Sequence, residues 1–476
     1  MSTYTKEFDA VVVGSGPNGL AAAITLQRKG LSVLVVEGRH TIGGGMRTAE
    51  LTLPGFRHDV CSAIHPMAIS SPFFSSLSLQ EHGLEFIHPT LPVAHPLENG
   101  EAVYLSRQLE ETAQTLGEDE KTYRKLIQPL TARWQDLAPD LLAPLHFPKH
   151  PLWMAAFGFY ALRSASTIAQ LFSTEKAKAL WAGLSAHAIQ PFTNKASAAI
   201  GLVLAATAHV QGWPIPKGGA QSIANAMASY FLSLGGKIET GTWIRSLSEL
   251  PGSTAVLLDV TPKQLLEIVA AELSPFYKQQ LKNYRQGMGV FKIDWALESA
   301  IPFKSAHCRQ AGTVHLGNSY QEIAQSEWET SQGKHPEKPF VLLAQQSLFD
   351  HTRAPQGKHT VWAYCHVPNG STVDMTEAIE KQVERFAPGF RALILARHTM
   401  NTRQLENYNP NYIGGDINGG IADLGQLYAR PALRWSPYKT SAKGIYICSS
   451  STPPGGGVHG MCGYHAAQQV IKEFFS

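Results

Sequence analysis

The order of elements at the start of the chain constrains the fold more than any other feature. Residues 8–13 (FDAVVV) have the pattern of a short buried strand that ends at Gly14. Residues 18–29 favour a helix that closes at Gly30, and residues 31–36 (LSVLVV) predict a second strand. A strand, a glycine loop, a helix and a strand in this order form a parallel βαβ unit.

The glycine loop has the spacing of a dinucleotide-binding motif, Gly14-Ser15-Gly16-Pro17-Asn18-Gly19. The first glycine permits the tight turn, the second lets a diphosphate approach the backbone, and the third lets the helix pack closely on the strand. The helix N-terminus adds free N–H groups and partial positive charge. We therefore expect all six residues to contact a dinucleotide.

Glu37 stands at the end of the second strand, where a carboxylate accepts hydrogen bonds from both ribose hydroxyls. A carboxylate there repels a 2′-phosphate, so an unphosphorylated ribose is favoured over NADP.

A second glycine-rich stretch distinguishes FAD from NAD. It begins directly after the acid with Gly38 and Arg39, and it continues with Gly43, Gly44, Gly45, Met46 and Arg47. Consecutive glycines let the backbone follow the diphosphate and ribityl chain of a flavin, and Arg47 is expected near the phosphates or the flavin edge. A nicotinamide-binding domain has no use for this segment, so FAD is the predicted cofactor.

The other end of the chain supports the same prediction. Residues 444–471 contain no Asp, Glu, Lys or Arg, and their glycines let the backbone pass close to a flat ring. The helix that follows would direct N–H groups at negative charge on the ring. We expect flavin contacts from Ser450, Gly457, Val458, His459 and Gly460.

Composition excludes several other classes. The chain has 476 residues, a net charge of +3 and only 16% charged residues, so it can bury a large core and has no dense basic patch for nucleic acid. The five cysteines form no CxxC pair, which predicts reduced thiols and no metal centre. The N-terminus resembles no secretory signal, and no segment has the length of a spanning helix, so a cytoplasmic location is expected.

Alternating strand and helix patterns, typical of α/β proteins, appear in three separated segments: 1–75, 217–262 and 432–476. We expect them to form one Rossmann-like FAD-binding domain. Strand patterns occur at residues 237–247 and 254–259 within the second of these segments. The intervening segments 76–216, mostly helical, and 263–431, mixed with strand-like runs at 289–297 and 360–366, would form an inserted α+β substrate domain. The predicted fold class is therefore α/β with a discontinuous cofactor domain.

These motifs resemble the phytoene-desaturase-like FAD-dependent oxidoreductases, which belong to the amine-oxidase-type flavoproteins. The resemblance rests on GSGPNG, Glu37, GGGMRT, the block that begins KGGAQSIANAMASYF and the terminal PGGGVHGMCGYHAA. It implies an FAD domain of the glutathione-reductase type, with Ile244 packed near the adenine. It also implies an apolar substrate such as a polyene, which the flavin dehydrogenates or isomerises.

Two motifs of related redox enzymes are missing from the sequence. Apart from the C-terminal motif already assigned to the flavin, there is no second GxGxxG that would bind NADPH, and there is no cysteine pair of the disulfide reductases. Disulfide-reductase chemistry is therefore excluded, and oxygen, a quinone or another external carrier is the expected electron acceptor.

The catalytic candidates are less determined by the sequence. His65 follows the glycine–arginine stretch and is a candidate acid/base or flavin ligand, although a structural histidine is the alternative. Tyr412 and Asp416 lie in a segment dense in polar residues and glycine, which predicts either a pocket wall or an Asx/Gly turn. Cys61 and Cys462 are expected to be small buried apolar groups.

Residues 152–172 carry five aromatic side chains, which suit ordinary core, a substrate tunnel or a peripheral membrane contact. The function predicted overall is removal of hydride from a hydrophobic small molecule to FAD. The alternatives are a redox-neutral flavin-dependent isomerase of a polyene, an amine oxidase, and a non-enzymatic flavoprotein that binds a partner protein.

Overall fold

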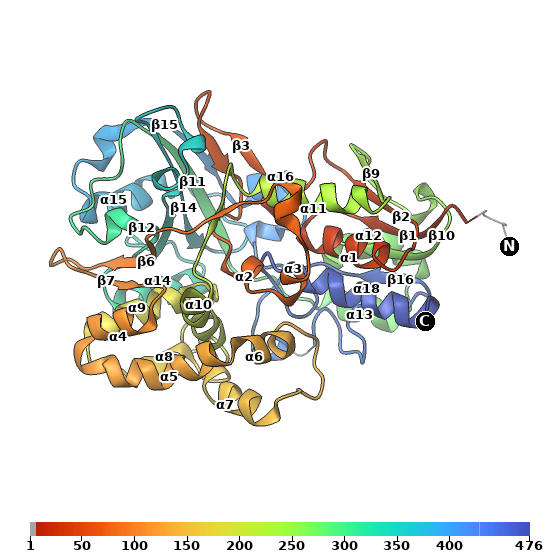
Figure 1. The fold of residues 1–476 in the computed structure, drawn as a ribbon, viewed down its shortest axis with the longest axis horizontal. Coiled ribbons are helices and arrows are strands. Elements are labelled where there is room, and N and C mark those ends of the chain that lie inside the picture. The colour runs from red at the N-terminus through yellow and green to blue at the C-terminus, as the bar shows by residue number, and fades with distance from the viewer. Residues whose placement is uncertain (1–5, 428) are drawn as a thin grey trace.

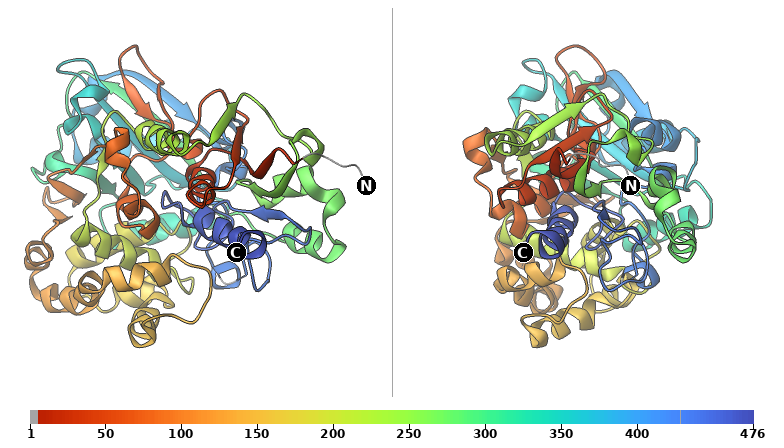
Figure 2. Two further views of the ribbon diagram at one scale, coloured as in Figure 1. Left: turned by 45° about the vertical axis from the view of Figure 1, so that its right-hand side comes forward. Right: turned by 90° about the vertical axis from the view of Figure 1, so that its right-hand side faces the viewer.

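The computed structural model describes residues 6–427 and 429–476 and builds them around two large sheets. Figure 1 shows the five-stranded sheet on the right, the seven-stranded sheet on the left and a helical layer along the lower edge. The two further views show the same parts in contact from other sides (Figure 2).

The five-stranded sheet is parallel throughout, in the order β16-β10-β1-β2-β9. Its strands come from three separate stretches of chain: β1 (Phe8–Val13), β2 (Val33–Glu37), β9 (Lys237–Thr240), β10 (Ser253–Leu258) and β16 (Ile445–Ile447). Strands from the three segments that we expect to form the cofactor domain therefore lie in one sheet. The strand β9 ends earlier than the sequence pattern suggested, because Gly241 turns the chain with φ +76°.

Alternate residues of these strands face two helical layers. Ala10 and Val12 of β1 pack toward α1 (Pro17–Gln27), α11 (Gln221–Ser233) and α18 (Met461–Phe474). Val11 and Val13 pack on the opposite face, toward α12 (Pro262–Val269) and α13 (Pro275–Lys282). Both faces are covered, which is why the strands are apolar on both sides.

The seven-stranded sheet has the order β15-β11-β14-β13-β12-β6-β7, and the pair β6–β12 is parallel. Its bounds are β6 (Leu91–Pro96), β7 (Ala102–Leu105), β11 (Gly289–Leu297), β12 (Ala311–Leu316), β13 (Val341–Ala344), β14 (His359–Val367) and β15 (Ile394–Met400). One face packs against α15 (Thr376–Phe386), and the other faces the helical layer and the first sheet. Two small ladders pair β3 (Thr48–Glu50) with β4 (Arg57–Asp59) and β5 (Phe86–Ile87) with β8 (Ile215–Pro216).

The helical layer comes from the stretch predicted to be mostly helical. It comprises α4 (Leu109–Thr115), α5 (Glu120–Ala132), α6 (Trp134–Leu141), α7 (Pro151–Ala161), α8 (Ala165–Ala169), α9 (Glu175–Ala186) and α10 (Ala198–Val210). The remaining helices are α2 (Pro66–Ile69), α3 (Pro72–Ser75), α14 (Tyr320–Ser331), α16 (Thr402–Tyr408) and α17 (Leu424–Leu427). Among the residues that the structure describes, no helix is both long and apolar enough to cross a membrane.

Candidate functional site

A cavity of about 370 Å³ lies between the two sheets. One end is lined by the loops that follow β1, β2 and β10, and the other end is lined by α10 and the inner face of strands β12 to β14. The N-terminal and C-terminal glycine motifs both contribute to its walls. The site therefore sits at the carboxyl ends of parallel strands, where α/β sheets bind ligands.

The first glycine loop forms the floor of the nucleotide end. Gly14, Ser15, Gly16, Pro17 and Asn18, which are predicted to contact the dinucleotide, line the cavity. Gly14 has φ +100°, so the turn requires glycine. A Cβ on Gly16 would lie 2.7 Å from Asp259 Oδ2, so only glycine fits here without displacing that side chain.

Gly19 does not line the cavity but serves as the packing glycine of the motif. A Cβ there would collide with the carbonyl oxygen of Gly14, because helix α1 starts directly against the turn. Its N–H donates to Asp259 Oδ2 at 3.0 Å. Burial, together with the nearby Glu37 charge, raises the pKa of Asp259 to about 7. The sequence reasoning missed Asp259, which stands at the end of the predicted strand 254–259.

Glu37 is buried at the end of β2 and is surrounded by donors. Its Oε2 accepts from the N–H of Ser15 at 3.0 Å and from the hydroxyl of Ser15 at 2.5 Å. Its Oε1 accepts from the N–H of Arg39 at 2.9 Å and from Arg47 Nη2 at 3.2 Å. The carboxylate is therefore fixed at the position where a ribose would reach it.

Arg47, expected near the phosphates or the flavin edge, is held by contacts within the protein at the nucleotide end of the cavity. Arg47 pairs with Glu37 and stacks its guanidinium over Tyr408, 5.6 Å from the ring centroid. Arg47 still lines the cavity, as do Gly44 and Gly45, whereas Gly43 and Met46 do not. Met46 packs in the core between α1 and α11 instead.

The far side of the nucleotide end is apolar and aromatic. Gly38, Arg39 and Ile244, which are predicted cofactor contacts, line it together with Trp243, which the sequence reasoning missed. The guanidinium of Arg39 lies over the Trp243 ring, 5.3 Å from its centroid. A flat base can pack in these surroundings, which fits the position expected for an adenine.

The C-terminal glycine motif lines the middle of the cavity. Ser450, Gly457 and Val458 contribute to its wall. His459 and Gly460 do not: the His459 ring bonds to Met461 N–H and to the Gly455 carbonyl, and it thereby shapes the loop. Gly460 is the N-cap residue directly before helix α18 and has φ +69°.

His65 is the predicted catalytic residue that the structure brings into the cavity wall. Only 1% of its surface is exposed, and neither ring nitrogen has a hydrogen-bond partner among the described residues. Burial lowers the pKa of His65 to about 4, so the imidazole is neutral above that pH.

Tyr412 also lines the cavity, with its hydroxyl directly over Gly45, but Asp416 does not. The Asp416 carboxylate accepts N–H groups of Gly287 at 2.7 Å, Asn418 at 2.8 Å and Gly420 at 2.9 Å. It holds these loops together, so the turn alternative applies to Asp416 and the pocket-wall alternative to Tyr412. Cys61 lines the cavity next to Tyr412, and burial raises the pKa of its thiol. Cys462 is fully buried.

The second sheet supplies the wall opposite the cofactor loops, and sequence reasoning missed these residues. Thr313, Leu342, Trp362 and Tyr364 line the cavity from strands β12, β13 and β14. Their shared face follows from the register, in which Leu342 pairs with Tyr364 and every second residue points the same way. The alternation of residues 360–366 was visible in the sequence, but it did not say which face meets the cofactor.

A buried ion pair continues this face on β11. Lys292 lies opposite Tyr364 and Asp294 lies opposite Trp362 in the ladder, and Lys292 Nζ bonds to the Asp294 carboxylate. Burial alone would raise the pKa of Asp294, but the Lys292 charge and the neighbouring histidines lower it by more, so the net shift is downward.

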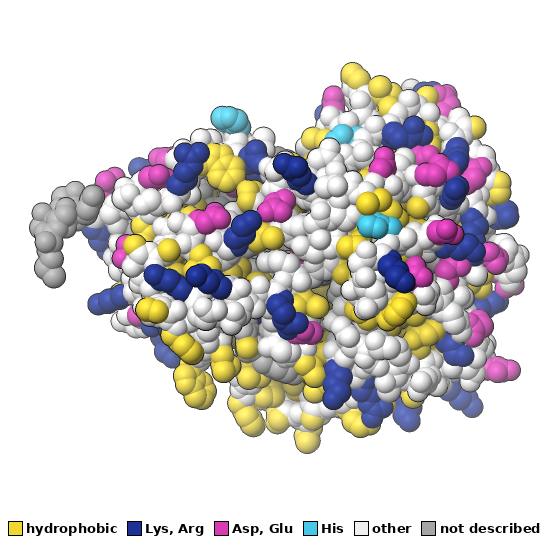
Figure 3. Space-filling model, turned by 180° about the vertical axis from the view of Figure 1, so that it is seen from behind, with side chains coloured by type: hydrophobic (Ala, Val, Ile, Leu, Met, Phe, Trp, Pro, Cys, Tyr) yellow, Lys and Arg dark blue, Asp and Glu magenta, His cyan; other side chains and the backbone are white. Residues whose placement is uncertain are grey.

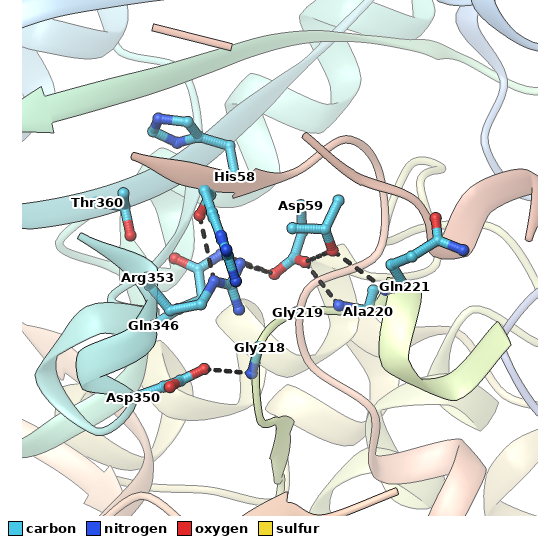
Figure 4. A network of polar contacts seen from close by, with 12 residues as sticks. His58, Asp59, Gly218, Gly219, Ala220, Gln221, Gln346, Asp350, Arg353 and Thr360 are labelled. Carbon is cyan, nitrogen blue, oxygen red and sulfur yellow. Dashed lines mark hydrogen bonds and ion pairs between the residues drawn. The ribbon is translucent and has the colours of Figure 1, made fainter. Parts of the chain in front are cut away.

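Figure 4 shows a network of polar contacts around Asp59, the last residue of β4. Arg353 Nη2 contacts Asp59 Oδ2 at 2.6 Å, and both side chains are fully buried. Asp59 Oδ1 accepts the N–H of Ala220 at 2.8 Å, just before α11. Asp350 accepts the N–H of Gly218 at 2.7 Å. Asp59 therefore fixes the strand that leads directly to Cys61 and His65.

The aromatic segment 152–172 does not line this cavity. Phe157 and Phe172 are buried in the core, which confirms the ordinary-core interpretation for them, whereas Phe159 is 58% exposed. Figure 3 shows hydrophobic side chains along the lower edge of the molecule, the edge on which α7 lies in Figure 1. The tunnel interpretation is therefore wrong for this cavity.

The residues present fit FAD. The backbones of Gly16 and Gly44 pack directly against each other at the nucleotide end, since a Cβ on Gly44 would lie 3.0 Å from Gly16 Cα. A fixed carboxylate stands beside them, and a second glycine loop lines the middle of the same cavity. Within residues 6–427 and 429–476, no cluster of side chains is arranged to hold a metal ion.

The comparisons with known proteins agree with this geometry. Residues 12–76 match the model of an NAD(P)-binding Rossmann-like domain. The chain is 27% identical to pyridine nucleotide-disulfide oxidoreductase domain-containing protein 2 of Mus musculus, over 98% of this chain and 94% of the relative. It is 21% identical to 4,4'-diapolycopen-4-al dehydrogenase of Metabacillus indicus, over 94% of this chain and 93% of the relative.

Among solved structures, a variant of putrescine oxidase superposes with a TM-score of 0.64 at 18% identity, over 98% of this chain and 99% of that chain. These likenesses confirm the expected mixed α/β fold with a Rossmann-like domain.

Proposed function

We propose that this chain, an FAD-dependent oxidoreductase with the fold of the amine-oxidase-type flavoproteins, dehydrogenates a hydrophobic small molecule. The observation that carries the proposal is the single cavity that joins the two glycine motifs to an apolar and aromatic wall. A purely nucleotide-binding module would need only the first end of that cavity.

Different residues along the cavity would bind different parts of the cofactor. The loop 14–18 would hold the diphosphate, Glu37 would hold the ribose, and the loop 449–458 would hold the flavin. When bound, FAD supplies the two-electron acceptor of the reaction. Oxygen, a quinone or another carrier then serves as the final acceptor.

His65 is the proposed proton acceptor. Loss of a C–H hydride and a neighbouring proton leaves a new double bond in the substrate, and the proton needs a base. The neutral imidazole of His65 has unpartnered nitrogens in the cavity wall and stays unprotonated above its lowered pKa of about 4. Tyr412 and the sheet residues Trp362 and Tyr364 line the same cavity and would limit the access of water to it.

The amine-oxidase alternative finds less support in the cavity. The carboxylates that line it, Glu37 and Asp259, both lie at the nucleotide end. A cationic amine in the apolar part would lose its hydration without a counter-ion.

Anaerobic titration tests the proposal. We expect a hydrophobic substrate to bleach the oxidised flavin band of the purified protein. Product from pre-reduced enzyme without net oxidation would instead identify an isomerase, and the absence of both would identify a non-enzymatic binding role.

A further inference from the structure

The wall at the apolar end of the cavity carries only a few polar atoms. Thr313 and Trp362 lie in one row across the sheet, because Thr313 pairs with Ala344 and Ala344 pairs with Trp362. Leu342 and Tyr364 form the next row. Most of this wall is therefore hydrocarbon and aromatic ring, and only a few polar atoms interrupt it.

Those polar atoms have no partner within the protein. Among the described residues, Trp362 Nε1, Thr313 Oγ1 and both ring nitrogens of His65 are buried and make no hydrogen bond. Each of these three residues lines the cavity and is at most 5% exposed. A buried polar group without a hydrogen-bond partner costs about 1–3 kcal/mol. Three such residues on the wall of one cavity therefore indicate that a ligand supplies the partner.

The chemistry of these atoms defines the group they can bind. The indole N–H of Trp362 can only donate, so the ligand must present an acceptor to it. Thr313 and a neutral His65 can donate or accept. A carbonyl or hydroxyl oxygen satisfies this set, whereas a plain hydrocarbon leaves the Trp362 N–H unpaired.

Formal charge on the ligand is excluded by the surroundings. Burial lowers the pKa of His65 to about 4 and that of His187 to about 3, so both lining histidines are neutral. Lys292 and Asp294, on the same sheet face, neutralise each other. An ammonium or a carboxylate would therefore be desolvated in this part of the cavity without a counter-charge.

We propose that the substrate is an uncharged, largely apolar molecule carrying a carbonyl or hydroxyl oxygen, and that the Trp362 indole N–H binds that oxygen. Thr313 and His65 offer further hydrogen bonds along the same wall. This inference rests on the proposed function, because it places the substrate in the cavity that also holds the cofactor.

Calorimetric titration of the FAD-loaded protein tests the inference with a matched series of probes: nonan-2-one, nonan-2-ol, nonane, nonylammonium and nonanoate. We expect the ketone or the alcohol to bind about tenfold more tightly than nonane, since one hydrogen bond contributes about 1 kcal/mol or more. Nonylammonium and nonanoate should bind more weakly than the ketone.

Two variants locate the interaction. Trp362→Phe should remove the roughly tenfold preference for the oxygen-bearing probes while leaving nonane binding unchanged. Thr313→Val keeps the shape of its side chain and should reduce the same preference if Trp362→Phe does not fold. Trp328→Phe, at an exposed tryptophan on α14, is the matched control and should bind all probes like the parent.

Equal binding of nonane and the ketone, tightest binding of nonylammonium or nonanoate, or no binding of the ketone and the alcohol would each overturn the inference. The flavin spectrum is recorded in parallel. Oxygen-selective binding without flavin bleaching by any hydrophobic compound would refute the proposed dehydrogenation and leave this inference standing. Bleaching by hydrocarbons without oxygen-selective binding would do the reverse.

Discussion

The carboxylate of Asp259 accepts a hydrogen bond from the backbone N–H of Gly19 at 3.0 Å, although the two residues are 240 positions apart in the chain. Asp259 stands at the end of β10, beside the glycine loop that follows β1. An acidic side chain is therefore held directly under the site where a negatively charged diphosphate is expected.

This relationship predicts that FAD binding weakens as the pH rises. Burial raises the pKa of Asp259 to about 7, so below that pH the carboxyl is neutral, and above it a negative charge faces the diphosphate. The dissociation constant of FAD, measured from about pH 5.5 to about pH 8.5, should increase through the pKa of Asp259. Asp259→Asn keeps the acceptor for Gly19 and should flatten that dependence, whereas an unchanged slope would assign the effect to another group.

The raised pKa of Asp259 also makes the free energy of unfolding depend on pH. Between the ordinary pKa of 3.8 and about 7, the folded chain retains a proton on Asp259 that the unfolded chain has lost. Raising the pH through this window therefore lowers the free energy of unfolding, by at most about 1.4 kcal/mol per pH unit from this group.

Gly16→Val should abolish retention of FAD. The first added carbon would lie 2.7 Å from Asp259 Oδ2, and the branched side chain would occupy the wall of the nucleotide end. The ratio of flavin to protein absorbance after purification measures the effect. Gly158→Ala, where an added Cβ meets no atom within 4 Å, is the control. A Gly16→Val protein that purifies with full flavin content would show that the diphosphate lies elsewhere.

Arg353→Met should destabilise the protein by about 3–5 kcal/mol, because it leaves the fully buried carboxylate of Asp59 without its counter-charge. Chemical denaturation followed by circular dichroism measures the change. Lys381→Met, at an exposed ion pair with Glu377, should change stability by less than about 0.5 kcal/mol. Similar losses in both variants would show that the buried pair has no special role.

His65→Gln should slow flavin reduction by a compound that bleaches the parent protein, by about 10²–10⁴-fold if His65 accepts the proton. FAD content should stay at the parent level. In the parent, the rate should be constant above about pH 5.5 and fall on acidification, because a pKa of about 4 leaves the imidazole neutral at higher pH. A parent-like rate in the variant would assign His65 a structural role.

The local part of the fold could be predicted because its signals are local. The strand at residues 8–13, the glycine loop and Glu37 lie within one βαβ unit. The structure places Val13, the loop residues 14–18 and Glu37 at one end of the cavity. The strand predicted at 289–297 has the same bounds in the structure.

The rest of the site depends on contacts between distant segments. Asp259 reaches Gly19 through the order of strands in the sheet, and Trp362 reaches the cavity through its register with Ala344. Asp416 and Tyr412 belong to one polar stretch, yet three backbone N–H groups hold Asp416 while Tyr412 faces the cavity. The composition and spacing of this stretch do not distinguish a loop-holding residue from a cavity-lining residue, so only the fold assigns these roles to Asp416 and Tyr412.

The proposed function requires one tightly held flavin between the N-terminal and C-terminal glycine motifs. The most direct test is the visible absorbance spectrum of the purified chain, before and after incubation with FAD and gel filtration. We expect the bands of oxidised flavin, with one FAD bound per chain. A chain that stays colourless after reconstitution would contradict it.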